Sequence, residues 1–270
     1  MRRIKLDLSY DGTNYSGWQT QPDVPTVQRT LETILQRITG EEISVVGSGR
    51  TDAGVHAVKQ VAAFTTSSRL EPDVFKRALN GFLPTDIRIN AAGEVPLAFH
   101  PIRHAVGKRY RYLIDDNRPS GPFTRNYCWV YREPLHIETM RQAAQFLLGE
   151  HDFSSFETQG SPRKTPIRTV SAVLVERTDG FGDMIPSLIR IEVEANGFLY
   201  NMMRAICGTL VRFGVEGRRG HADPDRMREI IDKADRSAAG PTAPPQGLYL
   251  LDVFYPTNCH QTALLQEPQM

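Results

Sequence analysis

Apolar residues recur along the chain with two different spacings, and each spacing predicts one kind of secondary structure. Between Thr26 and Gly40 they occur at every third or fourth position, as on one face of an amphipathic helix. Thr is a common N-cap and Gly often follows the last turn, so a helix is predicted over residues 27–39. Residues 4–10 alternate between apolar and polar side chains instead, which predicts a strand.

The other periodic segments extend this pattern through both halves of the chain. Strands that can pair with their neighbours, together with two long helices in each half, predict an α+β fold in which helices cover a mainly antiparallel sheet. Further helices are predicted near 73–82, 137–148, 197–213 and 224–235, the last capped by Asp223 and Pro224, and further strands near 43–46, 60–65, 86–91, 105–114, 168–177, 187–195 and 247–255.

These elements divide the chain into two halves of similar content. The N-terminal half, residues 1–104, and the C-terminal half, residues 105–256, each hold strands, helices and charged loops of similar length. No residue-level repeat relates them. Residues 257–270 show no periodicity and are expected to form a frayed tail. We expect one continuous unit made of two similar halves rather than two independent domains.

The composition is that of an ordinary globular protein. The chain has 270 residues, of which 40% are hydrophobic and 23% charged, and this excludes the disordered and fibrous classes. It has no run of about 18 apolar residues such as a membrane helix needs. The first residues also lack the apolar segment of a signal peptide, so we expect a cytosolic protein that does not enter a membrane.

The net charge of +1 hides an uneven distribution. Taken alone, a balance so close to zero argues against a basic tail or a polybasic patch at a membrane. Residues 99–114, however, carry +4, and residues 158–175 and 195–219 carry +3 each, which leaves −9 for the rest of the chain. Each run by itself is typical of a solvated face, but the three together predict a basic surface suited to a nucleic acid.

A glycine-rich segment at residues 47–56 is the strongest candidate for chemistry. It continues a predicted strand as Gly-Ser-Gly-Arg-Thr-Asp, which invites comparison with a dinucleotide-binding loop. That interpretation fails because Asp52 replaces the third glycine and no amphipathic helix follows; the Gly-Lys-Ser or Gly-Lys-Thr of a Walker loop is also missing. A tight turn with a solvated aspartate is the ordinary alternative. A carboxylate near Arg50, flanked by small residues, can instead keep its charge and act as a nucleophile or base.

Residues 49–56, Gly-Arg-Thr-Asp-Ala-Gly-Val-His, resemble the signature loop of the TruA family of tRNA pseudouridine synthases. Further motifs of that family occur in family order between residues 8 and 256, which makes the resemblance specific. It implies the pseudouridine synthase fold, in which two similar halves flank a central catalytic cleft. These motifs are Tyr10-Asp11-Gly12 with Gly17-Trp18-Gln19, Phe99-His100, Lys108-Arg109-Tyr110-Arg111-Tyr112, Asn201-Met202-Met203-Arg204 and Gly247-Leu248-Tyr249-Leu250.

The resemblance implies isomerisation of uridine to pseudouridine at positions 38, 39 and 40 of the tRNA anticodon stem-loop. The bond from N1 to C1′ breaks, the uracil turns, and C5 forms the new bond, so no atom is added and no cofactor is needed. Asp52 matches the family's catalytic aspartate, and a carboxylate suits a reaction that builds positive charge at the sugar carbon. Asp52 could attack C1′, attack the base or remove a sugar proton.

Three other residues match active-site positions of the family, and Arg50 is a further candidate. Tyr110 matches a tyrosine that stacks on the target uracil, although a strand tyrosine is also an ordinary packed aromatic. Arg204, on an apolar helix, matches the arginine that pairs with the catalytic aspartate; the alternative is a surface arginine at the helix edge. Arg50 is the candidate for filling the space of the flipped-out nucleotide, or else pairs only with Asp52 or with backbone. Leu248 matches an apolar position of the uracil pocket and is equally compatible with a core strand.

Two segments match parts of the family that contact tRNA. His100 and His104 have a spacing that could hold a metal on a helix, but Pro101 lies between them and no third ligand is near, so no metal is predicted. The predicted RNA-binding residues are Phe99, His100, Pro101, Ile102 and Arg103 in the first segment and Ser161, Pro162, Arg163, Lys164 and Thr165 in the second.

The leading hypothesis is an enzyme of this family that works as a homodimer, with tRNA bound across both subunits, as the resemblance implies. Two alternatives belong to other classes. One is a catalytically silent RNA-binding module that has kept the basic face. The other is a carboxylate-dependent nucleosidase that releases the free base.

Overall fold

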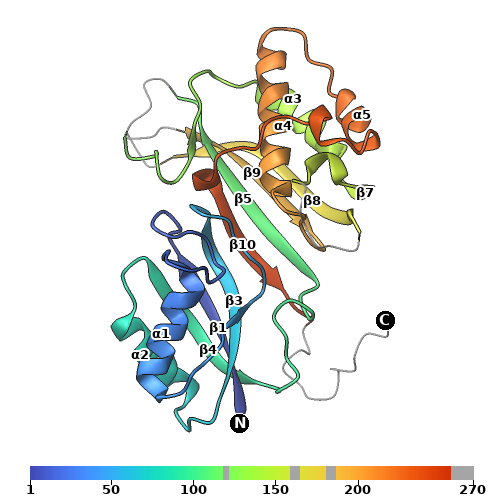
Figure 1. Cartoon of the computed structure of the whole chain (residues 1–270). Coiled ribbons are helices and arrows are strands. Elements are labelled where there is room, and N and C mark those ends of the chain that lie inside the picture. The colour runs from blue at the N-terminus through green and yellow to red at the C-terminus, as the bar shows by residue number, and fades with distance from the viewer. Residues whose placement is uncertain (118–121, 159–164, 181–186, 257–270) are drawn as a thin grey trace. The chain divides into compact units, whose positions relative to one another are not determined.

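The structure confirms the predicted α+β class, with helices packed on mostly antiparallel strands (Figure 1). The chain forms two compact units, one of Met1–Val106 with the chain from Leu250 onward, the other of Gly107–Tyr249. Most of the last strand thus belongs to the same compact unit as the N-terminal residues, whereas the sequence interpretation placed this strand in the C-terminal half. In the described part, no helix is long and apolar enough to cross a bilayer. This computed structural model describes residues 1–117, 122–158, 165–180 and 187–256.

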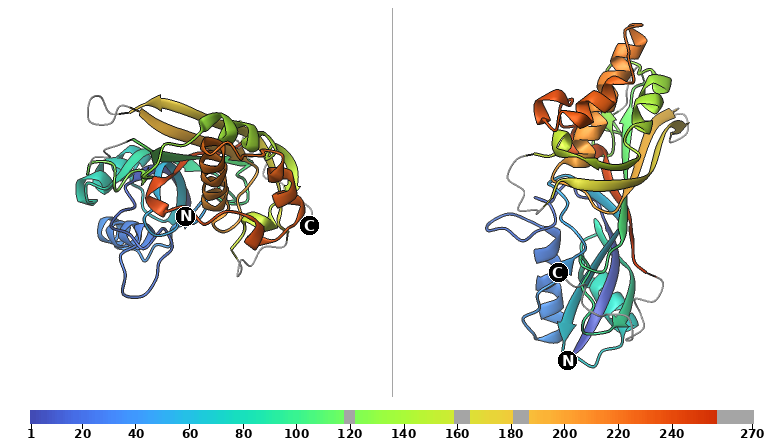
Figure 2. Two further views of the ribbon diagram at one scale, coloured as in Figure 1. Left: turned by 90° about the horizontal axis from the view of Figure 1, so that it is seen from above. Right: turned by 90° about the vertical axis from the view of Figure 1, so that its right-hand side faces the viewer.

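The first unit is an antiparallel sheet with two helices on one face (Figures 1 and 2). Its elements are β1 (Arg2–Tyr10), α1 (Val27–Thr39), β2 (Val46–Gly47), β3 (His56–Thr66), α2 (Pro72–Phe82), β4 (Ile87–Val95) and all but the first two residues of β10 (Leu248–Phe254), in the sheet order β4-β1-β3-β10 with β2 on β3. Alternate residues Ile4, Leu6 and Leu8 of β1 are fully buried. Phe64, opposite Ile4 on β3, lies edge-on to Phe75 of α2 at 5.4 Å between ring centroids. The helices therefore cover the apolar face predicted from the alternation.

The second unit has the same layered plan. Its elements are β5 (Gly107–Asp115), β6 (Trp129–Val130), α3 (Ile137–Gln145), β7 (Gly149–Asp152), β8 (Ile167–Asp179), β9 (Ser187–Ala195), α4 (Met202–Arg218) and α5 (Arg226–Asp232), with 3-10 turns at Ser154–Phe156, Arg236–Ala238 and Pro245–Gly247. The strands lie in the order β5-β9-β8-β7, all antiparallel, and β6 runs parallel to β5. Helices α3 and α4 cross closely, since a Cβ at Gly217 of α4 would lie 2.3 Å from Oγ1 of Thr139.

Helix α1 has its predicted bounds, and its side chains explain why a neighbouring strand prediction is wrong. Thr26 caps the first turn by accepting a hydrogen bond from a backbone N–H. The segment predicted as a strand, residues 43–46, pairs with β3 only at its last residue. The N–H of Val45 donates instead to Glu32, and its carbonyl accepts from Gln28, at 2.9 and 3.1 Å. Polar side chains of α1 thus occupy the backbone groups that a strand would need.

Three predicted helices have different ends in the structure. The helix predicted at 197–213 begins five residues later, because Asn201 has a φ of 61°, a left-handed conformation that a right-handed helix excludes. Helix α3 ends before the predicted residue 148, and the chain enters β7 at Gly149, whose φ is 101°. Helix α5 is shorter than the predicted 224–235, and Asp223 accepts a backbone hydrogen bond in the turn before it rather than capping it.

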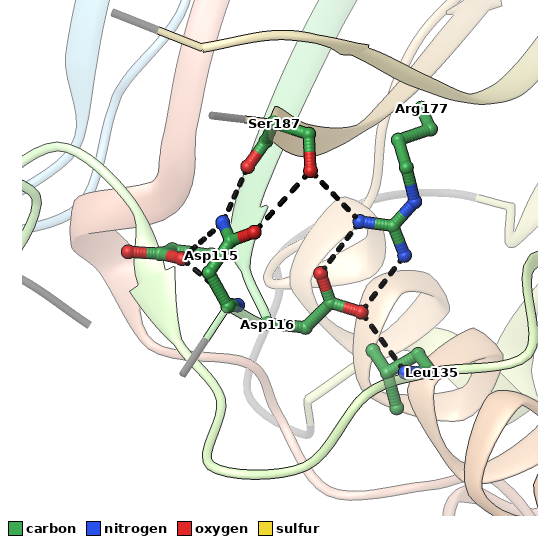
Figure 3. A network of polar contacts seen from close by, with 6 residues as sticks. Asp115, Asp116, Leu135, Arg177 and Ser187 are labelled. Carbon is green, nitrogen blue, oxygen red and sulfur yellow. Dashed lines mark hydrogen bonds and ion pairs between the residues drawn. The ribbon is translucent and has the colours of Figure 1, made fainter. Parts of the chain in front are cut away.

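A buried carboxylate joins the end of β5 to β8 and to the segment before α3 (Figure 3). Asp116 is 3% exposed, and its two oxygens accept hydrogen bonds from Arg177 at 2.8 and 2.9 Å. The N–H of Leu135 donates to the same carboxylate at 2.9 Å. Burial by itself raises the pKa of Asp116, but the hydrogen bonds from Arg177 and Leu135 outweigh burial and hold the pKa below its usual value.

We predict that the Asp116–Arg177 pair stabilises the second unit above about pH 4 and that acid removes this stabilisation. Because the folded-state pKa lies below the unfolded value of about 3.9, the contribution is present above that value and disappears as the pH falls through the folded pKa. Asp116→Asn should lower the free energy of unfolding at pH 7 by roughly 1–3 kcal/mol. This range allows for hydration of Arg177, whose side chain is 39% exposed.

Urea titrations of wild type and variant at pH 7 and pH 3 measure this effect, and the difference between the two proteins should shrink at the lower pH. Glu133→Gln is the matched control, since Glu133 forms an exposed pair with Arg218 at 3.4 Å. Its effect should stay below about 1 kcal/mol at either pH. Equal differences between wild type and Asp116→Asn at both pH values would contradict the assignment.

Candidate active site

The aspartate loop, residues 48–55, is held by close backbone contacts with the segment that follows β1. A Cβ at Gly12 would lie 2.1 Å from the carbonyl oxygen of Val55, and one at Gly17 would lie 2.5 Å from that of Thr51. Gly17 also has a φ of 91°, which favours glycine. Only glycine fits at these two positions, and this explains physically why the two glycine-containing motifs near residue 12 accompany the aspartate loop.

Hydrogen bonds fix the same loop from two further sides. The N–H of Trp18 donates to the carbonyl of Thr51 at 3.0 Å, and the buried hydroxyl of Tyr10 lies 2.8 Å from Oγ1 of Thr51. Burial raises the pKa of Tyr10 to about 12, so its hydroxyl stays protonated at neutral pH. From β3, the amide of Gln60 donates to the carbonyl of Gly49 at 3.0 Å. The loop therefore has a defined conformation within the first unit.

Asp52 and Arg50 occupy this loop with different exposures. Asp52 is half-buried, and its carbonyl accepts the N–H of Val55 at 3.1 Å, which closes a tight turn. The side chain of Arg50 is exposed. Its Nε donates to Oε1 of Gln19 at 3.1 Å, so one edge of the guanidinium is held by the segment after β1.

In the second unit, Tyr110 is a packed aromatic on β5. It lies opposite Val193 of β9, is 8% exposed, and meets Phe198 edge-on at 4.8 Å between ring centroids. Two residues further along, the hydroxyl of Tyr112 donates to the carbonyl of Pro244 at 2.6 Å. Leu248, at the start of β10, is 6% exposed. The ring of Tyr110 is thus fixed in orientation by its neighbours.

Arg204 lies in the first turn of α4, where two acceptors orient its guanidinium. Nε donates to the carbonyl of Ala243 at 2.7 Å, and Nη1 donates to Oδ1 of Asn201 at 2.9 Å. The N–H of Ala243 returns a hydrogen bond to the carbonyl of Arg204 at 3.0 Å. This segment can lie directly on α4 because residue 208 is glycine, where a Cβ would come within 1.7 Å of the carbonyl oxygen of Pro241.

The structure places the predicted site residues in two groups, each described within its own unit. Asp52 and Arg50 share the aspartate loop, while Tyr110, Arg204 and Leu248 lie on β5, α4 and β10. Sequence reasoning assigned no role to the residues that hold these groups in place. Their types are common and follow no periodic pattern. Tyr10, Gln19 and Asn201 stand in motifs quoted for the family resemblance, which is the only sequence signal for them, and the other three have none. The supporting residues are Tyr10, Gln19, Gln60, Phe198, Asn201 and Gly208.

The first predicted RNA-binding segment divides into buried and exposed residues. Phe99 is 2% exposed and packs against Tyr255 at 5.4 Å between ring centroids, and Pro101 is buried. Ile102 and Arg103 are exposed. Burial, together with the charge of Arg103, lowers the pKa of His100, which is therefore neutral at pH 7. Phe99 and Pro101 thus anchor the segment in the protein interior, and Ile102 and Arg103 expose their side chains at the surface.

Most of the second predicted segment lies outside the described residues. Ser161, Pro162, Arg163 and Lys164 belong to that part, while Thr165 is described and exposed. Oγ1 of Thr165 accepts the N–H of Ile167 at 3.2 Å, which shapes the start of β8.

Carboxylates of β9 neutralise part of the basic run at 99–114. Arg109 pairs with Glu194 at 2.6 Å and Arg111 pairs with Glu192 at 2.7 Å. These arginines share the face of β5 opposite the buried Tyr110. Two of the four positive charges counted in that window are therefore balanced by acids that are more than 80 residues away in the sequence.

Comparison with known proteins gives a consistent result. The family described as tRNA pseudouridine synthase matches residues 8–103 and 143–256. A tRNA pseudouridine synthase A of Thermoanaerobacter sp. (strain X514) is 44% identical over 255 residues, which cover 94% of this chain and 100% of the relative. The proteins of the same name from Acetivibrio thermocellus and Geotalea daltonii are also each 44% identical over 255 residues, with the same coverage.

We predict that adding one methyl group at Gly12 disrupts the aspartate loop. Gly12→Ala places a Cβ against the backbone of Val55, which cannot move aside as a side chain could, so the free energy of unfolding should fall by about 3 kcal/mol. Gly81→Ala is the matched control in the same unit, because nothing lies within 4 Å of a Cβ there. It should raise stability by up to about 1 kcal/mol, since alanine favours the helix.

Urea unfolding measures both variants, and hydrogen exchange at the amides of Trp18 and Val55 reports on the loop itself. Exchange at these two amides should be faster in Gly12→Ala and unchanged in Gly81→Ala. Equal stability of the two variants would show that the contact between Gly12 and Val55 does not constrain the loop.

Proposed function

The chain belongs to the tRNA pseudouridine synthase family, and from that premise we propose that it isomerises uridine to pseudouridine in tRNA, at positions 38, 39 and 40 of the anticodon stem-loop. Asp52 is the proposed catalytic carboxylate. The observation that carries the proposal is the aspartate loop, in which glycine contacts and hydrogen bonds hold the backbone around the half-buried Asp52. A carboxylate held in place can stabilise developing charge without first reorganising, which is the main source of electrostatic catalysis.

The proposed reaction rearranges bonds within one nucleotide. The glycosidic bond between N1 and C1′ breaks, positive charge develops at C1′, and Asp52 stabilises or captures that charge. The uracil turns and C5 bonds to C1′. The proton on C5 then leaves and N1 gains a proton, so atoms and charge balance and the proposal requires no cofactor or metal.

Three residues of the second unit complete the proposed site. Arg204 would pair with Asp52 and keep it ionised, a role supported by the two acceptors that orient its guanidinium. Tyr110 would stack on the uracil and help remove the C5 proton, and the edge-on contact with Phe198 supports this role by fixing its ring. Leu248 would provide an apolar wall of the uracil pocket.

Arg50 is the proposed residue that replaces the flipped-out nucleotide. A uridine inside a stem cannot present its glycosidic bond to a carboxylate, and flipping it costs a few kcal/mol. The exposed, planar guanidinium of Arg50, held at one edge by Gln19, is suited to fill the vacated space. The proposal extends to tRNA contacts at Ile102 and Arg103 and to a cytoplasmic homodimer, as in the family that the chain resembles.

One assay separates this function from its alternatives. Unmodified tRNA carrying tritium at C5 of uracil is incubated with the protein. Isomerisation releases tritium into water while the uracil stays attached to the RNA, whereas a silent RNA-binding module releases nothing. A nucleosidase releases labelled free base. Wild-type protein that binds tRNA without releasing tritium would refute the proposal.

We predict that Asp52→Asn abolishes tritium release. The amide keeps the size and planar shape of the carboxylate but lacks its charge and replaces one acceptor oxygen with a donor, so the rate should fall by at least about four orders of magnitude. Asp23→Asn is the matched control, because Asp23 lies in an exposed turn with a φ of 59°, which asparagine adopts readily. It should release tritium at the wild-type rate. Substantial turnover by Asp52→Asn would remove Asp52 from the mechanism.

We predict that Arg204→Ala loses turnover while it keeps most of its affinity for tRNA. An arginine that acts only on the catalytic carboxylate contributes to kcat and little to binding. Single-turnover tritium release and filter binding measure the two quantities separately. Arg228→Ala, in the same unit, is the control: this exposed arginine lies over the ring of Phe146, and its removal should change neither quantity. Loss of affinity alone in Arg204→Ala would make Arg204 a phosphate contact instead.

A further inference from the structure

Asn201 has an unusual backbone conformation for which its sequence position alone gives no reason. It stands directly before α4 with a φ of 61°, and among the described residues only Asp23 and Ala234 share a positive φ without being glycine. Asparagine tolerates this conformation better than most residues, but glycine tolerates it better still. A residue that accepts this backbone strain is expected to use its side chain.

Both ends of the Asn201 amide form hydrogen bonds. Oδ1 accepts from Nη1 of Arg204 at 2.9 Å, and Nδ2 donates to Oγ1 of Thr158 at 3.0 Å. The chemistry of the partners fixes this orientation, because a guanidinium only donates and must therefore face the amide oxygen. Thr158 is anchored in turn, since its N–H donates to the carbonyl of Tyr200 at 3.1 Å.

We propose that Asn201 is a positioning residue that sets the orientation of the Arg204 guanidinium and is itself held by Thr158. The inference rests on the proposed role of Arg204 in catalysis. Arginine has several freely rotating bonds, and ordering such a side chain costs up to about 2 kcal/mol. The two acceptors at Nε and Nη1 fix both the position and the rotation of the guanidinium plane. The acceptor at Nε is a backbone carbonyl, whereas the acceptor at Nη1 is the Asn201 side chain, which a substitution can remove.

Asn201→Gly is the first test, because glycine keeps the left-handed backbone and removes only the amide. We expect kcat for tritium release to fall about 10- to 100-fold, the rate factor that corresponds to losing one hydrogen bond to a charged group. KM for tRNA should change less than about threefold. Ala234→Gly is the matched control. It makes a comparable change at a φ of 48° in the same unit and should leave kcat and KM as in wild type.

A double-mutant cycle distinguishes positioning from a general structural effect. In the background of Arg204→Ala, the donor to Asn201 is gone, so adding Asn201→Gly should lower the residual rate by less than about twofold. Asn201→Asp keeps the acceptor for Arg204, and the Thr158 hydroxyl can donate to its second oxygen. This variant should retain at least about a fifth of the wild-type kcat.

A third variant keeps the test independent of the backbone at residue 201. Thr158→Val removes the acceptor for Nδ2 and should lower kcat about two- to fivefold, again only when Arg204 is present. Unchanged kcat in Asn201→Gly, or the same loss with and without Arg204, would overturn the inference. If Asn201→Gly does not fold, an unchanged kcat in Thr158→Val would overturn it. Failure of wild type to release tritium would refute the proposed function itself, which is a separate result.

Discussion

The carbonyl oxygen of Val55 occupies the space where a side chain at residue 12 would begin, and the position of Asp52 depends on this contact. Because the two backbones meet without an intervening Cβ, the aspartate loop and the end of β1 share one arrangement. Ordering a loop costs about 1–2 kcal/mol for each residue fixed. Here that cost is part of folding, so binding energy from a substrate is not needed to place the carboxylate.

The second unit uses the same constraint at Arg204. Gly208 lets the segment at Pro241 lie directly on α4, and this brings the carbonyl of Ala243 within 2.7 Å of the arginine. In both units, a charged side chain of the proposed site stands next to a backbone contact that excludes any residue but glycine. The two charged groups are positioned in different ways. The backbone of the aspartate loop positions Asp52, whereas the guanidinium of Arg204 is oriented by hydrogen-bond acceptors from other residues.

The sequence predicts correctly those helices and strands whose ends are set by residues at the ends themselves. It fails where groups elsewhere in the folded structure set the boundary. The bounds of α1 follow from Thr26 and Gly40, which lie at its ends. The start of α4 was placed too early because the residues before Asn201 continue its apolar pattern, while the left-handed backbone that ends it is set by the folded structure. Roles in chemistry came from the family resemblance. The hydrogen bond between Asn201 and Thr158 joins residues 43 positions apart, and the hydrogen bond between Gln60 and Gly49 follows no periodic pattern, so neither could be predicted from the sequence.

The ion pairs of Arg109 with Glu194 and Arg111 with Glu192 reduce the positive charge that the basic run at 99–114 can offer to a polyanion. Nucleic-acid affinity depends on salt in proportion to the number of phosphates that protein cations neutralise, because each releases condensed counterions. An arginine already paired with a carboxylate must first give up that partner, so it contributes little to this release. The effective number of cations on this face of β5 is therefore smaller than a count of Lys and Arg suggests.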